Sequence, residues 1–305
     1  MRALLAASRR YVDVVADIDG SPLQGHTIAN LFFEDSTRTR TSFTNAAHRL
    51  RAHVSNLLGA FSSVTKGETL IDTARNVEAM GVRALVIRAR QGGSAALIAR
   101  HVKCPVINAG DGRHEHPTQG LLDLYTLAEA KGRLSDFDLR GLRVAIVGDV
   151  VSSRVARSNI AGLTTMGAEV VCVGPAGLAP RSLEALAPGR VHVAPQLDDV
   201  LERVDAVMLL RVQFERHAPV EGASKNSPAI ASVREYRSFF GMTSQRAARL
   251  KPDAIIMHPG PINRGLELDP DVADGPRSVI LRQVTVGVGV RMAALEACTL
   301  AAAGA

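Results

Sequence analysis

The sequence predicts an α/β protein of two domains, each a doubly wound parallel sheet covered by helices. Apolar, strand-like runs alternate with helix-like runs along the chain, an order typical of parallel sheets with helices on both faces. The alternation stops at the polar, glycine-bounded segment 131–141 and then starts again. The chain has 305 residues, more than the roughly 250 residues that a single hydrophobic core usually holds.

The interruption sets the expected domain boundaries. Residues 1–130 would form the first domain and residues 131–286 the second, with residues 287–305 packing back on the first. In such folds, ligands bind in the crevice beyond the carboxyl ends of the strands. We therefore expect the functional residues directly after the strands and the active site in the cleft between the domains.

Each element is predicted from its own stretch of sequence. In the first half, strands are expected at 27–33, 84–89 and 105–109, and helices at 42–50, 94–101 and 119–130. In the second half, strands are expected at 143–149, 169–175, 206–212 and 254–261, and helices at 158–167 and 289–303. The small polar residues around Gly67 predict a flexible loop that enters a further helix.

Composition narrows the classes of function. The formal net charge of +6 would suit nucleic acid or small anionic substrates. The basic residues are dispersed among acids, however, and Trp is absent, so nucleic-acid binding is not favoured. Cys104, Cys172 and Cys298 lie far apart, which argues against a disulfide framework or zinc site and fits a reducing cytosol. The apolar start is too short for a signal peptide, and no run approaches the ~18 apolar residues of a membrane span.

The segment Ser36–Thr41 places hydroxyls and two arginines between a predicted strand and a predicted helix. A helix N-terminus supplies N–H groups and partial positive charge, and arginine adds a fork that matches phosphate. At ~100° per residue, Arg38 and Arg40 point ~200° apart, with Arg40 nearer the apolar side that holds Phe43. Arg38 is therefore the candidate ligand and Arg40 a structural residue. The alternative is a hydroxyl-rich helix cap with solvated arginines.

Further polar residues follow the other predicted strands. Arg88 ends a strand beside the expected crevice, where it is either a ligand or a surface charge. Lys66 lies in a loop and would usually be solvated. In the loop NAGDGRHEHPTQG, the HxH spacing of His114 and His116 is a weak metal signal without an obvious third ligand. Donation from His116 and Gln119 to a carbonyl or phosphoryl oxygen fits better.

The second half repeats the arrangement without a nucleotide motif. The stretch RVAIVGD…SSRVARSN lacks both GxGxxG and a Walker loop. Arg154 begins the next predicted helix, while Arg211 and Gln213 follow another strand. Two arginines at strand ends could each bind one carboxylate of a dicarboxylate. Gly260–Pro261 forms a rigid turn after the last strand.

Together the stretches FFEDSTRTRTSF, SSVTKGETL, VIR, GDGRHEHPTQGLLDLYT, SRVARSN, RVQFER and MHPGPINRG resemble the aspartate/ornithine carbamoyltransferase family. They occur in the family's order over nearly the whole chain. Lys66 in KGET, together with RVQ and HPGP, is similar to the aspartate branch, because the ornithine branch carries a cysteine where Pro259 stands. The resemblance implies transfer of a carbamoyl group from carbamoyl phosphate to the α-amine of L-aspartate, a step of pyrimidine biosynthesis.

The resemblance also assigns residues. Those expected at carbamoyl phosphate are Ser36, Thr37, Arg38, Thr39, Ser62, Arg88, His116, Gln119, Gly260 and Pro261. Those expected at L-aspartate are Lys66, Arg154, Arg211 and Gln213. The expected catalytic residues are Arg38, Thr39, Lys66, Arg88 and His116. Glu34 and Glu215 would pair with arginines of the second domain. Neither a metal nor an organic cofactor is expected, because positioning and fixed positive charge can suffice.

The resemblance further implies a cytoplasmic homotrimer with shared active sites, because Ser62 and Lys66 would come from a neighbouring subunit. Regulatory or dihydroorotase chains could join a larger assembly. Two departures stand out: Val151 and Ser152 replace an expected histidine, and the chain reaches its first strand early, by Thr27. The alternatives are a carbamoyltransferase with another amine acceptor, a catalytically silent scaffold, or a basic nucleic-acid-binding protein.

Overall fold

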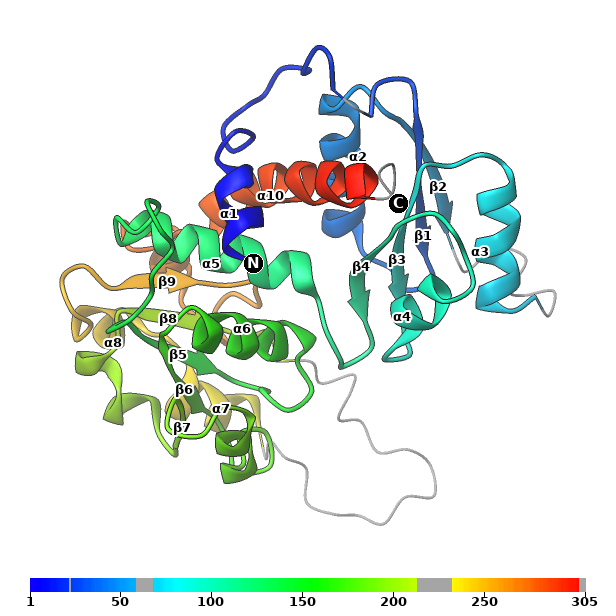
Figure 1. The fold of residues 1–305 in the computed structure, drawn as a ribbon. Coiled ribbons are helices and arrows are strands. Elements are labelled where there is room, and N and C mark those ends of the chain that lie inside the picture. The colour runs from blue at the N-terminus through cyan, green and yellow to red at the C-terminus, as the bar shows by residue number, and fades with distance from the viewer. Residues whose placement is uncertain (22, 59–67, 213–231, 302–305) are drawn as a thin grey trace, which may run out of the picture. The chain divides into compact units, whose positions relative to one another are not determined.

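The computed structural model describes residues 1–21, 23–58, 68–212 and 232–301. It confirms the predicted fold class, because all paired strands of both sheets run parallel and helices accompany them (Figure 1). The described residues pack into two compact units, residues 1–122 with 284–305 and residues 123–283. The divisions fall within two helices, α5 (Pro117–Ala130) and α10 (Ile280–Ala301), rather than at the predicted boundaries after residues 130 and 286.

The first unit is built around a four-stranded sheet in the order β2-β1-β3-β4. Its strands are β1 (Thr27–Phe32), β2 (His53–Leu58), β3 (Ala84–Ala89) and β4 (Val106–Asp111). Its helices, besides parts of α5 and α10, are α1 (Arg2–Ser8), α2 (Thr37–Arg49), α3 (Leu70–Ala79) and α4 (Ser94–Ala99). Residues 84–89 were predicted as a strand to the residue, and α2 begins at Thr37, within the segment Ser36–Thr41 where a helix N-terminus was expected.

Both faces of this sheet are buried. One face packs Ile28 and Val86 against α2 and α10, in a core that includes Phe43 and Met292. The opposite face packs alternate strand residues, among them Leu85, against α3 and α4. This two-sided burial explains why the strands are almost continuously apolar.

The second unit contains a five-stranded sheet in the order β7-β6-β5-β8-β9. The strands are β5 (Arg143–Val147), β6 (Glu169–Val173), β7 (Val191–Ala194), β8 (Ala206–Leu209) and β9 (Ile255–Met257). The α-helices that lie wholly within it are α6 (Arg154–Thr165), α7 (Val233–Phe240), α8 (Ser244–Ala248) and α9 (Pro270–Ala273). Short 3₁₀ helices lie at η3 (Arg181–Leu186), η4 (Leu197–Asp199) and η5 (Leu201–Arg203). The predicted strand starts at residues 143, 169 and 206 match β5, β6 and β8.

One face of this second sheet packs on η4, η5 and α7, in a core that contains Leu197, Leu201 and Phe240. Helices α5 and α6 lie over the other face (Figure 1). Gly162 lets α6 approach α5 closely, since a Cβ at this position would lie 2.7 Å from Leu124 Cδ1.

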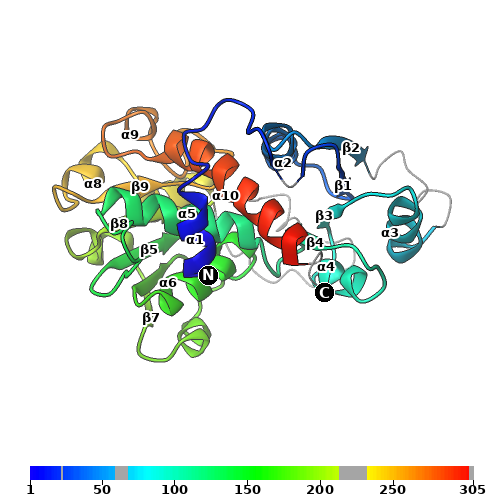
Figure 2. The same ribbon diagram turned by 45° about the horizontal axis from the view of Figure 1, so that its top comes forward.

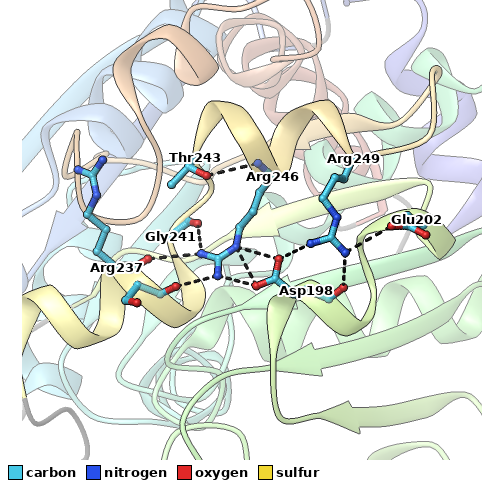
Figure 3. A network of polar contacts seen from close by, with 8 residues as sticks. Asp198, Glu202, Arg237, Gly241, Thr243, Arg246 and Arg249 are labelled. Carbon is cyan, nitrogen blue, oxygen red and sulfur yellow. Dashed lines mark hydrogen bonds and ion pairs between the residues drawn. The ribbon is translucent and has the colours of Figure 1, made fainter.

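An arginine-centred network fixes α7 and α8 to η4 (Figure 3). Asp198 accepts hydrogen bonds from Arg246 Nη2 at 2.6 Å and from Arg249 Nη1 at 2.6 Å. Arg246 also donates to the carbonyl oxygens of Ser238 at 2.7 Å and Gly241 at 2.8 Å. Ser238 lies in the last turn of α7 and Gly241 is its C-cap residue, and carbonyls at a helix end lack intrahelical donors. Arg246 therefore serves as a C-terminal cap for α7 and links it to η4.

Helix α10 begins nine residues before the predicted start at residue 289. Residues 280–288 were not predicted as helical, because Gly287 and the β-branched residues around it favour helices poorly. A Cβ on Gly289 would lie 2.7 Å from the backbone nitrogen of Val12, so glycine is required where the N-terminal segment crosses. Figures 1 and 2 both show α1 beside α10.

The expectation that no segment could span a membrane needs one correction. Helix α10 is long and apolar enough by length and composition, with a mean hydropathy of 1.4 in its best window. In the structure 61% of that window is buried, as in the core helix of a globular domain.

Replacing Arg246 should test the network of Figure 3. Arg246→Lys keeps the charge but loses the planar fork, so we expect a loss of about 1–3 kcal/mol of stability. The matched control is Arg249→Lys, because Arg249 is 44% exposed and surface pairs contribute ~1 kcal/mol or less. Thermal unfolding of both variants measures the two losses of stability. Equal decreases in unfolding temperature would show that Arg246 has no special capping role.

Candidate functional site

The strand orders of the two sheets place two topological switch points. In the first sheet the order reverses between β1 and β3, which are neighbours through the pair Phe32 and Arg88. In the second sheet it reverses between β5 and β8. Ligands of doubly wound sheets bind in the crevice at the carboxyl ends of these strands.

Helix α2 follows β1 and starts with an open N-terminus. Its N-cap, Ser36, makes no side-chain hydrogen bond to the first helical turn. By contrast, Thr69, Ser153, Ser232 and Thr243 each accept a backbone N–H at the start of α3, α6, α7 and α8. Among these five helices, α2 is therefore the one whose N-cap side chain does not occupy a first-turn N–H group.

The side chains of this turn divide as the helical geometry predicts. Thr37 and Arg38 are exposed, Arg40 is half-buried, and Thr39 is only 8% exposed. Arg38 is therefore the arginine that lies farther from the core. The structure thus agrees with the expected orientation of the two arginines, although it does not test their roles.

Arg88 lies at the end of β3 and is 8% exposed, so it is not the surface charge of the alternative interpretation. Its Nη1 donates to the carbonyl oxygen of Ala109 at 3.1 Å, and its Nη2 lies 3.5 Å from Glu34 Oε1. A guanidinium held at a switch point can bind an anion without first losing much side-chain entropy. The predicted pairing of Glu34 with arginines of the second domain stays a prediction.

Asp111 organises the loop after β4. Its Oδ2 accepts the backbone N–H of Gly93 at 2.6 Å, and its Oδ1 accepts that of Glu115 at 3.0 Å. Asn108 and His114 donate to the same carboxylate, each at 3.0 Å. Burial alone would raise the pKa of Asp111, but these hydrogen bonds outweigh it and hold the pKa below its usual value. Asp111 is therefore a carboxylate that fixes the approach to His116.

His116 and Gln119 open helix α5 and are 4% and 8% exposed. The backbone carbonyl of His116 accepts the N–H groups of Gln119 and Gly120, at 3.0 and 3.1 Å. His114, in contrast, is about half exposed and bound to Asp111. Within the described ranges, no group of three His, Cys, Asp or Glu side chains could hold a metal ion. The two histidines of the HxH pair thus differ in surroundings.

In the second unit, the loop after β5 leads to Arg154. Asp149 Oδ1 accepts the N–H of Ser152 at 3.1 Å, and Ser153 Oγ accepts that of Ala156 at 3.1 Å, capping α6. Arg154, the first residue of α6, is only 7% exposed. Val151 and Ser152 stand where a histidine was expected, yet hydrogen bonds to Asp149 and Ser153 still fix the loop and the start of α6.

The loops after β8 and β9 hold the other predicted residues. Arg211 follows β8 and is half-buried, while Gly260 and Pro261 follow β9. His258 begins the second loop, and its backbone N–H donates to Gln283 Oε1 at 3.0 Å. Three predicted ligands therefore follow two neighbouring strands.

A buried chain of hydrogen bonds extends from this loop to two helices. Gln283 Nε2 donates to Asp123 Oδ1 at 2.7 Å, and Asn159 Nδ2 donates to Asp123 Oδ2 at 2.7 Å. Asp123 lies on α5 and Asn159 on α6, and both are essentially inaccessible to solvent. These hydrogen bonds thus tie the loop after β9 to α5, which directly follows His116, and to α6, which begins with Arg154.

The sequence analysis missed the buried acids that support these loops: Asp111, Asp123, Asp149 and Glu267. Their only sequence signal was an acidic residue inside or beside an apolar segment, which is weak. Ser62, Lys66, Gln213 and Glu215 lie outside the described residues, so their predicted roles are not placed.

Comparison with known proteins agrees with the motifs. The family model described as aspartate/ornithine carbamoyltransferase, carbamoyl-P binding domain, matches residues 1–129. The model of the Asp/Orn binding domain matches residues 140–298. A relative in Myxococcus xanthus, the aspartate carbamoyltransferase catalytic subunit, is 54% identical over 289 residues, which cover 93% of this chain and 92% of the relative.

Two solved structures are similar over almost the whole chain. Aspartate transcarbamoylase from Trypanosoma cruzi, in complex with carbamoyl aspartate and phosphate, has a TM-score of 0.80 and 31% identity, covering 96% of this chain and 90% of that one. The catalytic subunit of M. jannaschii aspartate transcarbamoylase has a TM-score of 0.81 and 30% identity, covering 99% and 95%.

Substituting Asp111 should loosen the loop before His116. Asp111→Asn replaces a carboxylate, which only accepts hydrogen bonds, with an amide whose NH₂ group would face backbone N–H groups. We therefore expect the free energy of unfolding to fall by about 1–3 kcal/mol at neutral pH. A carboxyl with a lowered folded-state pKa stabilises above its unfolded value, here 3.8, and that contribution is lost as the pH falls below it. The stability of the variant should therefore differ most from that of the wild type above pH 3.8. A stability difference that stays constant during acid unfolding would contradict the assignment of Asp111 as a stabilising carboxylate.

Proposed function

Because the chain belongs to the aspartate/ornithine carbamoyltransferase family, we propose that it transfers the carbamoyl group of carbamoyl phosphate to the α-amine of L-aspartate. The products would be N-carbamoyl-L-aspartate and phosphate, as in pyrimidine biosynthesis. The relatives named above, of the aspartate branch, support this acceptor.

One observation carries the proposal. In each sheet, the predicted ligands lie at the ends of the two strands that flank the switch point or follow these strands: Ser36–Thr39 and Arg88 in the first sheet, Arg154 and Arg211 in the second. His116 and the Gly260–Pro261 turn follow the next strands in the two sheets, β4 and β9. Residues far apart in sequence thus gather where the fold binds ligands.

In the first unit, the phosphate of carbamoyl phosphate would bind the open N-terminus of α2. The N–H groups of the first turn, Arg38 and the hydroxyls of Ser36, Thr37 and Thr39 together suit a phosphate dianion. Arg88 would reach both the phosphate and the carbamoyl oxygen. His116 and Thr39 would donate to that carbonyl oxygen and polarise it.

In the second unit, Arg154 and Arg211 would each bind one carboxylate of L-aspartate through a bidentate pair. Two cations rather than an acidic residue favour a dicarboxylate over the ammonium of ornithine. The backbone carbonyls near Gly260 and Pro261, together with Gln119, would accept hydrogen bonds from the carbamoyl amine. That the two halves meet in a cleft stays a prediction.

The reaction then needs no change of oxidation state. The neutral α-amine attacks the carbamoyl carbon and forms a C–N bond, and negative charge develops on the carbonyl oxygen. The tetrahedral intermediate collapses, the C–O bond to phosphate breaks, and its electron pair leaves with phosphate. The leaving phosphate can take the amine proton, so His116 need act only as a donor. Arg88 and His116 would stabilise the oxyanion.

The assembly forms part of the same proposal. A cytoplasmic homotrimer with shared active sites is supported by the family resemblance of the segment that holds Ser62 and Lys66. The wide spacing of the three cysteines in the sequence would suit a reducing compartment. Regulatory or dihydroorotase chains could associate with such a trimer.

The direct test is a product assay with carbamoyl phosphate and either L-aspartate or L-ornithine. We expect carbamoyl aspartate alone. Citrulline would show that the second unit binds a different acceptor, and a trimer that forms neither product would favour the scaffold alternative.

His116→Ala should lower kcat by about 10²–10³, the usual loss for one oxyanion donor. His114→Ala is the matched control two residues away. It removes a half-exposed pair with Asp111, worth ~1 kcal/mol or less, so kcat should stay within about fivefold of the wild type. Similar losses in both variants would mean that loop integrity, rather than donation from His116, limits the rate.

Arg211→Ala should raise KM for L-aspartate about 10- to 100-fold, because a charge-assisted bond contributes roughly 1.5–3 kcal/mol. KM for carbamoyl phosphate should change far less, since its predicted ligands lie mainly in the other unit. Steady-state kinetics with each substrate varied in turn measure the two KM values separately. A normal KM for L-aspartate would remove Arg211 from the site.

A further inference from the structure

Glu267 is a buried carboxylate to which neither the sequence motifs nor the proposed reaction gives a role. It is 0% exposed and lies between β9 and α9. Its Oε1 accepts the backbone N–H of Val212 at 2.8 Å, and its Oε2 accepts that of Asn263 at 2.8 Å. The side-chain amide of Asn263 donates to Oε1 as well, at 2.8 Å. Both oxygens are therefore occupied by donors.

These bonds join two loops of the candidate site. Val212 directly follows Arg211 after β8, and Asn263 lies two residues beyond Pro261 after β9. The side-chain amide of Asn263 also lies 3.4 Å from the carbonyl oxygen of Val212. One carboxylate thus sets the spacing between the predicted aspartate arginine and the turn predicted to hold the carbamoyl amine.

The backbone of Glu267 is itself held firmly. Its carbonyl oxygen accepts the N–H of Met242 at 2.8 Å, and its neighbours Leu266 and Leu268 lie in the core of the second unit. Met242 directly follows Gly241, whose carbonyl is bound by Arg246 in the network of Figure 3. The carboxylate is therefore presented from a fixed frame toward two irregular loops.

A carboxylate suits this position because it only accepts hydrogen bonds. Burial raises the pKa of Glu267, while the bonds from Val212 and Asn263 oppose that rise. Glutamine has the same shape but would direct its NH₂ group at an N–H donor. At least one of the two loops would then lose its fixed position.

We propose that Glu267 is a positioning residue for the acceptor substrate, holding the backbone beside Arg211 in register with the Gly260–Pro261 turn. This inference rests on the proposed function, in which Arg211 binds a carboxylate of L-aspartate. It extends that function by assigning part of the acceptor affinity to a residue that touches no substrate.

The test is Glu267→Gln, assayed with carbamoyl phosphate and L-aspartate. We expect KM for L-aspartate to rise about tenfold or more, the effect of roughly 1.4 kcal/mol, while KM for carbamoyl phosphate stays within about threefold. Asn263→Ala, which leaves the carboxylate and both backbone donors in place, should shift the same KM in the same direction but less. This milder variant keeps the test decisive if Glu267→Gln does not fold.

Asp205→Asn is the matched control. Asp205 is also buried, and it accepts the backbone N–H of Arg143 at 2.8 Å and a bond from Lys251 at 2.7 Å. It precedes β8, at the amino ends of the strands, away from the loops of the site. The Asp205→Asn substitution should lower the unfolding temperature without changing KM for L-aspartate.

The outcomes separate the two proposals. A wild-type protein that makes no carbamoyl aspartate would overturn the proposed function. An active wild type whose Glu267→Gln and Asn263→Ala variants lose stability like Asp205→Asn, but keep a normal KM for L-aspartate, would overturn the positioning role alone.

Discussion

Loops that follow parallel strands expose backbone N–H groups that no ladder pairs, and in this protein buried carboxylates accept them. Asp111 serves the loop after β4, Asp149 the loop after β5, and Glu267 the loops after β8 and β9. Asp123 acts indirectly: it accepts a hydrogen bond from Gln283, whose side-chain oxygen accepts the backbone N–H of His258. Buried N–H groups must find partners, and satisfying them in this way fixes the loops before any ligand arrives.

Carboxylates are a costly choice for such positions, yet the geometry offsets the cost. A buried charge is tolerated when both oxygens receive hydrogen bonds, and bonds to an ionised acceptor are roughly twice as strong as neutral ones. Asp123 receives one donor on each oxygen, and Asp111 receives four in all. Their charge is thus directed at hydrogen-bond donors of the loops and helices around them.

Sequence reasoning recovered the fold because its signals are local. The strand at 84–89 was predicted to the residue, since a run of apolar β-formers needs no partner to be recognised. Helix α10 was predicted too short because its valines and glycines favour helices poorly, and only packing against the N-terminal segment overrides that preference. The candidate ligand residues could be predicted from the sequence because they follow predicted strands. The role of Glu267 could not be predicted, because its partner Val212 lies 55 positions away and nothing in LELDPD marks the residue as buried.

The two switch points are built differently, and the difference bears on which ligand each can bind. At the first, Ser36 leaves the N-terminus of α2 uncapped; at the second, Ser153 caps α6 and takes up one of its donors. A phosphate has oxygens spread in three dimensions and fits converging N–H groups and hydroxyls. A carboxylate is planar and fits the fork of a guanidinium. An open helix end beside Arg88 therefore favours the phosphate-bearing substrate, whereas a capped helix that begins with Arg154 favours the carboxylates. The proposed division of ligands between the two units thus agrees with a hydroxyl that caps α6 and another that does not cap α2.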